Sequence, residues 1–509
     1  MRRRIAQLQN NTRTSSTGFI WDPCDVRYLS TRGQAPILGF DDVLLAGLAR
    51  DGGLYLPESW PHLSVDMIAD FAGRPFHEVA VEVIAPFTGD TITRPELLAM
   101  ARSAYAGFGH PATTPLVQIG PSRFVLELFH GPTLAFKDVA MQLLARMMDH
   151  VLEKRGRRAT IVGATSGDTG GAAIEAFRGS KRVDVVILFP DGRVSDVQRR
   201  MMTTPTEGNV HAVAIEGTFD DCQALVKGMF NDHAFRDRVG LSGINSINWG
   251  RIVAQITYYF VAAAALGAPR RAMSFVVPTG NFGDIFAGYA AKRMGLPIER
   301  LVIASNANDI LPRTLETGVY ETRPVAQTSA PSMDIGVSSN FERYLFEASD
   351  RDADFVRTAM GSLAQSGRFD LGAAAHGQMR ADFGATRASE ADIADATRQL
   401  LDTAQYLVCP HTACAFGQPS SASARSSNAS IPEIILATAS PAKFPEALEA
   451  TTGLQPGLPP RLSRLMSDPE RYERVHNDLA AVERHVEACA AASLTSGAHP
   501  NTISRSGTA

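Results

Sequence analysis

The sequence predicts an α/β protein in which open layers of helices cover parallel sheets. Short β-branched runs alternate with stretches of helical periodicity along most of the 509 residues, a rhythm typical of strand–helix units. Glycine-rich turns separate strand from helix in several of these units. Ligands of such sheets bind at the carboxyl ends of the strands, and the polar loops of this sequence fall at those ends.

The strand–helix units follow one another through the central and C-terminal parts of the chain. A strand, a glycine-rich turn and a helix are predicted in "RATIVGATSGDTGGAAIEAF" and again in "AMSFVVPTGNFGDIFAGYAAKRMG". A strand followed by a helix is predicted in "GNVHAVAIEGTFDDCQALVKGMF" and in "IPEIILATASPAKFPEAL". Single strands are predicted in "RVDVVILFP" and "RLVIASNAND", and the sequence shows no internal repeat of fixed period.

Composition and charge narrow the class of protein. Hydrophobic residues make up 45% and charged residues 20% of the chain, and the formal net charge is −4, as in an ordinary soluble protein. No basic surplus indicates a nucleic-acid partner, and no apolar run reaches the roughly 18 residues that a membrane span requires. The five cysteines form an odd and sparse set, which favours a reducing compartment, and we expect a cytoplasmic location.

One stretch raises the question of a metal site. In "CPHTAC", Cys409 and Cys414 flank His411, but the spacing is not a standard zinc pattern and no second pair lies nearby. Buried packing thiols are the favoured interpretation, and no metal is predicted.

Lys137 stands in an unusual position in "LFHGPTLAFKDVAMQLLARMM", where the helical spacing begins. The start of a helix disfavours a cation, and the preceding Leu-Ala-Phe run partly desolvates the side chain. Both effects favour the neutral amine and should lower its pKa, as a Schiff base with a carbonyl cofactor requires. An ordinary surface lysine is the alternative.

Two glycine-rich loops are candidate anion sites. In "PTGNFGD", Pro278 to Asp284, backbone N–H groups and a helix start could cradle a phosphate, without the lysine of a P-loop or the GxGxxG of a dinucleotide fold. In "GATSGDTGGAA", Thr165, Ser166 and Thr169 supply donors at another helix start and could hold a carboxylate. A structural strand–helix turn and a capped helix start are the respective alternatives.

A third loop, "LATASPAKF", places Thr438 and Ser440 after the apolar run "EIIL". A hydroxyl group there could hydrogen-bond a neutral ring nitrogen. The alternative is a structural threonine at the end of a strand.

These motifs together resemble the threonine synthase family, of the longer bacterial and fungal type. The resemblance runs from about Val26 to about Asp478 and rests on "FHGPTLAFKD", "GATSGDTGGAA", "NSINWGRI", "PTGNFGD", "PSMDIGVSSNFERYLFE" and "LATASPAKF". It implies a fold type II pyridoxal-phosphate enzyme, similar to the tryptophan synthase β subunit. Any one loop alone would not separate this family from serine or threonine dehydratases and cysteine synthases.

The resemblance also implies how the chain is divided. An N-terminal domain and two open α/β lobes lie between an N-terminal extension, expected to be disordered, and a flexible tail. In chain order, these five parts would span residues 1–25, 26–112, 113–262, 263–487 and 488–509. A Ser-rich surface loop is expected over residues 417–430.

Site roles follow residue by residue from the resemblance. Lys137 would form the Schiff base with pyridoxal phosphate, and Thr438 would meet its pyridine nitrogen. Backbone amides would wrap the cofactor phosphate at Gly280, Asn281, Phe282, Gly283 and Asp284. The substrate carboxylate would be held by Thr165, Ser166 and Thr169. The substrate phosphate would be held by Ser246, Asn248 and Arg251, with Ser30, Thr31, Arg32, Asn340 and Arg343 as weaker candidates.

The implied reaction converts O-phospho-L-homoserine and water to L-threonine and phosphate, the last step of threonine biosynthesis. It combines γ-elimination of phosphate with β-addition of water, and freed Lys137 would remove the α-proton. One alternative is a related phospho-lyase or dehydratase that yields α-ketobutyrate, and another is a non-catalytic sensor of a phosphorylated metabolite. A monomer or a homodimer is expected, with the small-molecule substrate as its partner and neither nucleic acid nor membrane.

Overall fold

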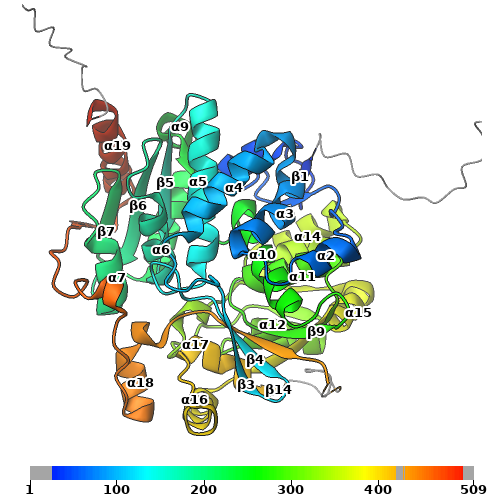
Figure 1. Ribbon diagram of the computed structural model, residues 1–509. Coiled ribbons are helices and arrows are strands. Elements are labelled where there is room, and N and C mark those ends of the chain that lie inside the picture. Colours follow the sequence, from blue (N-terminus) through cyan, green and yellow to red (C-terminus); the bar gives the residue numbers. More distant parts are fainter. Residues whose placement is uncertain (1–25, 420–427, 429, 497–509) are drawn as a thin grey trace, which may run out of the picture.

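The computed structural model describes residues 26–419, 428 and 430–496, and it is organised around two sheets (Figure 1). The expected extension over residues 1–25, most of the Ser-rich stretch and the end of the tail lie outside the described residues. In the described part of the chain, no helix combines the length and the apolar character needed to cross a membrane.

The larger sheet has seven strands in the order β14-β13-β10-β9-β15-β4-β3. The five inner strands are parallel, and the edge strands β14 and β3 are antiparallel to their neighbours. In sheet order the strands span Gln418–Pro419, Phe383–Arg387, Ile298–Ser305, Met273–Pro278, Glu433–Ala437, Arg123–Glu127 and Leu116–Gly120.

The smaller sheet has five strands, all parallel, in the order β16-β7-β6-β5-β8. They span Glu473–Val475, Val210–Ile215, Val183–Pro190, Ala159–Ala164 and Leu241–Ser242. Strand β6 is buried at every position, because helices cover both faces of a parallel sheet. The parallel α/β layers expected from the alternating strand and helix patterns are thereby confirmed.

The two faces of the smaller sheet belong to different hydrophobic cores. Val186 and Leu188 of β6 join the cluster that contains residues of α8 and α19, whereas Val185 and Ile187 join the main core with α5 and α6. This division follows from the alternation of side chains along a strand. The helices of this lobe are α5 (Lys137–Lys154), α6 (Asp168–Phe177), α7 (Asp196–Thr203), α8 (Phe219–Asn231), α9 (His233–Val239) and α19 (Leu479–Ser496).

The helices between residues 249 and 452 belong to the lobe of the larger sheet. They are α10 (Trp249–Ala265), α11 (Gly283–Arg293), α12 (Ile310–Thr317), α13 (Phe341–Ala348), α14 (Ala353–Ser366), α15 (Gly372–Asp382), α16 (Glu390–Ala404), α17 (Pro410–Ala413) and α18 (Pro445–Thr452). A small antiparallel pair, β11 (Val319–Glu321) with β12 (Arg368–Asp370), lies among them. The 3₁₀ helices are η1 (Gly89–Thr91), η2 (Pro331–Met333), η3 (Cys414–Phe416), η4 (Pro441–Lys443) and η5 (Pro460–Leu462).

The N-terminal domain packs against α10 through aromatic side chains. The rings of Tyr28 and Phe87 lie 6.0 and 5.7 Å from the ring of Trp249 at the start of α10. The hydroxyl group of Tyr28 also accepts a hydrogen bond from the indole N–H, at 3.2 Å. The elements of this domain are β1 (Tyr28–Ser30), α1 (Phe40–Ala46), β2 (Tyr55–Pro57), α2 (Val65–Asp70), α3 (Phe76–Thr88) and α4 (Arg94–Tyr105).

The two sheets exchange strands across the expected lobe boundaries. The ranges 113–262 and 263–487 would assign β3 and β4 to the first lobe and β16 to the second. Instead, β4 pairs with β15 in the larger sheet, and β16 pairs with β7 in the smaller one. Sheet membership depends on pairing between distant segments, which a division of the chain into consecutive ranges does not contain.

Candidate active site

Lys137 begins α5, and a segment about 300 residues further along the chain holds the loop before it in place. The loop before it runs antiparallel to the end of the "LATAS" motif, with the Phe136 N–H donating to the Thr438 carbonyl at 2.8 Å. The Ser440 N–H donates to the Leu134 carbonyl at 3.0 Å. This pairing brings Thr438 beside Lys137, as the proposed cofactor site requires, and leaves the Thr438 side chain only 6% exposed.

The amine of Lys137 lies in a buried and charged environment. Its side chain is 11% exposed, and Nζ lies 3.3 Å from Oδ2 of Asp168. Burial lowers the pKa of Lys137, the Asp168 carboxylate opposes that change, and the cations of Lys443 and Arg251 reinforce it. Lys137 is therefore not an ordinary surface lysine. Its amine is suited to act as a nucleophile and a base.

Asp168 and Lys443 are site residues that the sequence reasoning missed. Lys443 Nζ lies 2.5 Å from Oδ1 of Asp168, and the two side chains are almost fully buried. Both belong to the motifs "GATSGDTGGAA" and "LATASPAKF", in which the hydroxyl side chains and not the charged ones were the predicted ligands. The available signal was a charged residue in each of two otherwise small or apolar loops.

The glycine loop between β9 and α11 has the character of an anion cradle. In the described chain, the main-chain N–H groups of Asn281–Asp284 find no acceptor, as is usual for the first turn of a helix. Phe282 adopts φ +62°, a left-handed conformation that costs energy in a residue with a Cβ. This turn exposes the N–H groups at the end of a parallel strand, where an anion can accept from them.

Neighbouring segments fix the shape of this loop. The Ser338 hydroxyl donates to the Gly280 carbonyl at 2.6 Å, and the Asn340 side-chain amide donates to the carbonyls of Asn281 and Ser246. A Cβ at Gly280 would lie 3.0 Å from the carbonyl oxygen of Ser332, so a larger residue would require the loop or its neighbour to shift. The loop is thus held close to the "NSINWGRI" segment.

The carboxyl group of Asp284 is buried beneath the loop and not exposed on the surface. The hydroxyl groups of Tyr258 and Tyr259 donate to its Oδ1 at 2.5 and 3.0 Å, and its Oδ2 has no partner in the described structure. Burial raises the pKa of Asp284 to about 6. This side chain is anchored in the core beneath the loop, and only its backbone is available to an anion.

Arg251 is a buried cation without a carboxylate partner among the described residues. It is 3% exposed, its Nη1 donates to the Ile244 carbonyl at 3.3 Å, and its Nε has no partner there. Burial lowers the pKa of Arg251 to about 10. Buried charges are normally paired, so an uncompensated guanidinium near Lys137 is a candidate ligand for an anion. Ser246 is partly exposed on the same segment.

Asn248 has a structural role that accounts for all of its polar atoms. Its side-chain amide donates to the carbonyls of Leu44 and Gly243, and its oxygen accepts from the Gly250 N–H as the N-cap of α10. No donor of this side chain is left for a phosphate. The spacing in "NSINWGRI" could not separate a helix cap from a phosphate ligand.

The weaker phosphate candidates are also engaged within the protein. Arg343 is fully buried and donates to the Tyr55 and Ile247 carbonyls and to the Asn340 side chain. Thr31 and Arg32 bond to the carboxylate of Glu342, and the Ser30 hydroxyl bonds to Asp51. The contacts of Thr31, Arg32 and Arg343 connect the N-terminal domain to α13, whereas that of Ser30 lies within the domain.

In the loop before α6, Thr165 fixes the backbone conformation, and the side chains of Ser166 and Thr169 are partly accessible to a ligand. Thr165 Oγ1 accepts from the N–H groups of Gly167 and Gly170, both at 2.9 Å, which leaves its O–H as a donor. Ser166 and Thr169 are partly exposed. These positions suit a carboxylate at a helix N-terminus.

The side chains of "CPHTAC" serve packing and capping. Cys409 Sγ accepts from the Thr412 N–H, Cys414 Sγ contacts the Pro410 carbonyl, and His411 Nε2 accepts from the Ser332 N–H. Across the described residues, no group of three His, Cys, Asp or Glu side chains is arranged to hold a metal ion.

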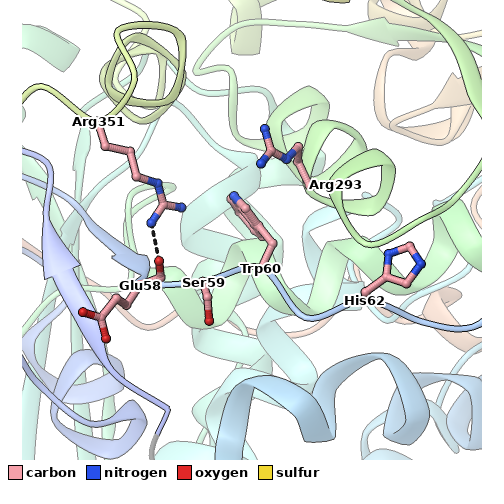
Figure 2. A pocket seen from close by; sticks show the side chains of 6 residues that line it. All are labelled: Glu58, Ser59, Trp60, His62, Arg293 and Arg351. Carbon is pink, nitrogen blue, oxygen red and sulfur yellow. Dashed lines mark hydrogen bonds between the residues drawn. The ribbon is translucent and has the colours of Figure 1, made fainter. Parts of the chain in front are cut away.

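A separate pocket of 450 Å³ opens between the N-terminal domain and α11 (Figure 2). Its lining comprises Glu58, Ser59, Trp60, His62, Arg293 and Arg351. Arg351 donates to the Glu58 carbonyl at 2.5 Å, and the Trp60 indole donates to Glu347 at 3.0 Å. Lys137 is not part of this lining, so the pocket is distinct from the candidate active site.

A buried lysine whose pKa is lowered by burial, together with an amide-lined loop at the end of a parallel strand in an α/β fold, defines the class as a pyridoxal-phosphate enzyme of fold type II. Residues 109–360 match the family model for pyridoxal-phosphate dependent enzymes. Residues 27–105 and 412–486 match the threonine synthase N-terminal and C-terminal models. The chain belongs to the threonine synthase family and is a pyridoxal-phosphate dependent lyase.

Similarity to individual proteins covers most of the chain. Threonine synthase of Pseudomonas aeruginosa is 48% identical over 462 residues, which are 91% of this chain and 98% of that protein. The structure of pyridoxal-phosphate-bound threonine synthase from Brucella melitensis matches with a TM-score of 0.88 and 57% identity, over 92% of this chain and 100% of that one. Yeast threonine synthase matches with a TM-score of 0.86 and 36% identity, over the same shares. The family, the fold and the cofactor expected from the sequence motifs are thereby confirmed.

Proposed function

We propose that this enzyme converts O-phospho-L-homoserine and water to L-threonine and inorganic phosphate. The observation that carries the proposal is the buried Arg251 guanidinium, which has no carboxylate partner in the described structure and lies close enough to Lys137 to lower its pKa. A pyridoxal-phosphate enzyme needs one phosphate site for its cofactor. An uncompensated cation next to the reactive lysine fits a substrate that carries its own phosphate.

The residues of this chain fit pyridoxal phosphate. Lys137 Nζ would bind the cofactor carbonyl, the N–H groups of Gly280, Asn281, Phe282, Gly283 and Asp284 would hold its phosphate, and Thr438 would hydrogen-bond its ring nitrogen. The free N–H groups of the loop and the close approach at Gly280 support this assignment. When bound, the cofactor supplies an electron sink for charge that develops at the α-carbon of the substrate.

The remaining site residues act on the substrate. Thr165, Ser166 and Thr169 donate to its carboxylate, and Arg251 with Ser246 binds its phosphate. Lys137 Nζ, once free, removes the α-proton, and burial and the neighbouring cations lower the pKa of this amine, which favours the neutral form that such a base requires. Arg251 stabilises the negative charge that grows on the phosphate as it leaves. We exclude Asn248 from the phosphate site because its donors are taken.

One set of assays tests this function. The purified protein is incubated with O-phospho-L-homoserine, and phosphate, threonine and α-ketobutyrate are measured together. We expect equal amounts of phosphate and threonine. Release of α-ketobutyrate in place of threonine would indicate the related phospho-lyase, and the absence of any product would indicate a binding protein. The Lys137→Ala variant should lose both turnover and the visible absorption of the bound cofactor.

The cellular setting is part of the proposal. We propose a cytoplasmic enzyme that acts as a monomer or a homodimer, in line with a small diffusible substrate. Light scattering coupled to size-exclusion chromatography distinguishes the two assemblies. We also retain the division into an N-terminal domain and two lobes, with β3, β4 and β16 exchanged between the sheets as described.

A further inference from the structure

The candidate active site contains a second buried lysine that the proposed reaction does not use. Lys443 is 1% exposed at the end of η4, and its Nζ lies 2.5 Å from Oδ1 of Asp168. Lys137 Nζ lies 3.3 Å from the other oxygen of the same carboxylate. One carboxylate is therefore shared between two amines, and only one of them is placed to react.

We propose that Lys443 is a positioning residue, whose ammonium group neutralises Asp168 so that the carboxylate holds Lys137 in place without fixing it as a cation. This inference rests on the proposed function, because it concerns the same reactive amine. Asp168 alone would orient Lys137 but would also stabilise its charged form. With Lys443 on its other side, the carboxylate can orient the amine at a smaller electrostatic cost to the neutral form.

Four side chains hold the carboxylate of Asp168 in one orientation. Gln198 Nε2 donates to Oδ1 at 2.9 Å and the Ser332 hydroxyl donates to Oδ2 at 3.2 Å, in addition to the two lysines. Burial opposes ionisation of this carboxyl group, but the nearby cations, Lys443 first, hold the pKa of Asp168 well below its usual range. Asp168 is therefore an anion at neutral pH, and its orientation is set from both oxygens.

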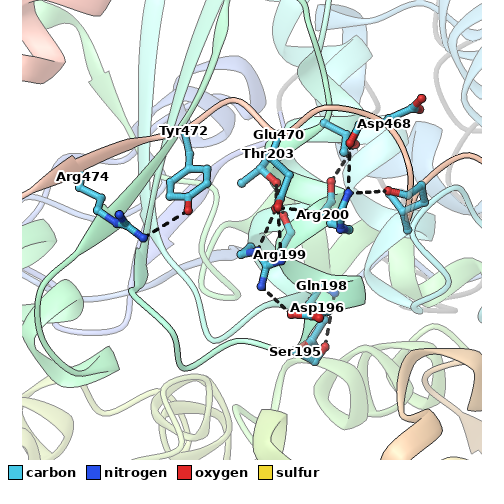
Figure 3. A network of polar contacts seen from close by, with 12 residues as sticks. Ser195, Asp196, Gln198, Arg199, Arg200, Thr203, Asp468, Glu470, Tyr472 and Arg474 are labelled. Carbon is cyan, nitrogen blue, oxygen red and sulfur yellow. Dashed lines mark hydrogen bonds and ion pairs between the residues drawn. The ribbon is translucent and has the colours of Figure 1, made fainter.

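Gln198 is itself held by a polar network between α7 and the C-terminal segment (Figure 3). Next to it on α7, Arg199 forms an ion pair with Glu470 at 2.8 Å, and the Thr203 hydroxyl donates to the same carboxylate at 2.7 Å. Arg200 donates to the carbonyl of Asp468 at 3.1 Å. These contacts fix α7 and, through Gln198, the carboxylate that faces Lys137.

The charges around Lys137 come from five packed elements. Asp168 on α6 favours its protonation, whereas Lys443 on η4 and Arg251 on α10 oppose it. Asp284 on α11 and His411 on α17 also interact electrostatically with the amine. Among these groups, Lys443 is the cation that forms an ion pair with the Lys137 counter-ion. Its removal would leave the full charge of Asp168 acting on Lys137.

A purely mechanical role must be separated from this electrostatic one. Lys443 Nζ also donates to the Thr133 carbonyl at 2.9 Å and so braces the loop that precedes Lys137. Arg461 braces the same loop by donating to the carbonyls of His130 and Gly131, at 3.2 and 2.7 Å, without contacting Asp168. Arg461→Met is therefore a matched control for a loosened loop with the charges at Lys137 unchanged.

The test is a pH titration of the visible absorption of the holoenzyme, which follows protonation of the Lys137 nitrogen without turnover. We expect Lys443→Met to raise the midpoint by about 1–2 pH units, the size of one charge interaction at a separation of roughly 6–8 Å, the span across the shared carboxylate, in a partly screened interior. Lys443→Arg and Arg461→Met should leave the midpoint within about 0.3 units. The Asp168→Asn variant should lower it, and the double variant Asp168→Asn with Lys443→Met should fall between the two single variants.

The outcomes separate this inference from the proposed function. An unchanged midpoint in Lys443→Met, or an equal shift in Arg461→Met, would overturn the role of Lys443 even if the wild-type enzyme forms threonine. A wild-type holoenzyme that forms no threonine would instead refute the proposed function. If Lys443→Met does not fold, Asp168→Asn and Lys443→Arg still decide: a midpoint that does not fall in the first, or that moves by a full unit in the second, contradicts the inference.

Discussion

Replacing Arg251 by Met should stabilise the fold while it abolishes catalysis. Arg251 is 3% exposed, donates one hydrogen bond to protein, and forms no ion pair within the described residues. Burial lowers its pKa from an ordinary value of 12.5 to about 10. A guanidinium that is more acidic in the folded chain than in the unfolded chain destabilises the folded state at every pH below about 10, and so at neutral pH.

The size of this effect follows from the same pKa. A tenfold change in proton affinity corresponds to about 1.4 kcal/mol, so the buried charge costs about 3 kcal/mol of stability. The variant loses the hydrogen bond to the Ile244 carbonyl, worth about 1 kcal/mol. Methionine fills much of the same volume, because its unbranched side chain adapts to irregular space. The expected net gain in the free energy of unfolding is about 2 kcal/mol.

Arg343→Met is the matched control, because Arg343 is also fully buried and its pKa is lowered to about 9 by burial. Its guanidinium, however, donates to three acceptors of the protein, at Tyr55, Ile247 and Asn340. Each buried acceptor left without a donor costs about 1–3 kcal/mol, which offsets the gain from removing the charge. We therefore expect the Arg343 variant to be less stable than the Arg251 variant.

Urea unfolding in phosphate-free buffer at pH 7 and steady-state kinetics provide the two measurements. The Arg251 variant should unfold at higher urea concentration and lose at least about a thousandfold in kcat/KM for O-phospho-L-homoserine, as expected for an interaction with the leaving group. Added inorganic phosphate should raise the unfolding midpoint of the wild type more than that of the variant. A destabilised Arg251 variant, or one that keeps wild-type kcat/KM, would refute the reasoning.

Two further predictions follow from the same site. Gly280→Ala should weaken cofactor binding by about tenfold or more, because its Cβ would lie 3.0 Å from the Ser332 carbonyl oxygen; an absorbance titration with pyridoxal phosphate checks this, and unchanged affinity contradicts it. Burial lowers the pKa of His411 to about 4, below its ordinary value of 6.5, so the folded chain resists protonation and should lose about 3 kcal/mol of stability as the pH falls from about 6.5 to 4. His411→Gln should lose less over that range in acid-dependent urea unfolding, and an equal loss would assign the acid sensitivity to other groups.

The sequence predicted those parts of the site that are formed by a single continuous segment of the chain. The loop "PTGNFGD" follows a buried parallel strand and opens a helix, so both its position and its free N–H groups follow from adjacent residues. The same is true of Lys137, whose helix start and apolar flank lie within one stretch of sequence. In both cases the helix start that shapes the site and the residue whose properties it changes are neighbours in the chain.

Features that depend on distant residues could not be predicted in this way. The pairing of Asp168 with Lys443 joins two motifs whose separation in sequence carries no information about distance in space. Asn248 has the composition of a phosphate ligand, but the carbonyl of Leu44, in another domain, takes one of its donor groups. The exchange of β4 and β16 between sheets has the same origin, because strand partners are chosen by long-range packing.

The order of strands in the larger sheet has a consequence for synthesis on the ribosome. Strand β15 lies between β9 and β4, so these two strands have no common neighbour until Glu433–Ala437 has been made. Thr133 and Lys443 are 310 positions apart, which is about 15–60 s of translation at roughly 5–20 residues per second. During that interval the edges of β9 and β4 that pair with β15 in the folded protein lack this partner. The cofactor pocket is therefore among the last parts of the molecule to form, since Thr438 and Lys443 follow β15 in the chain.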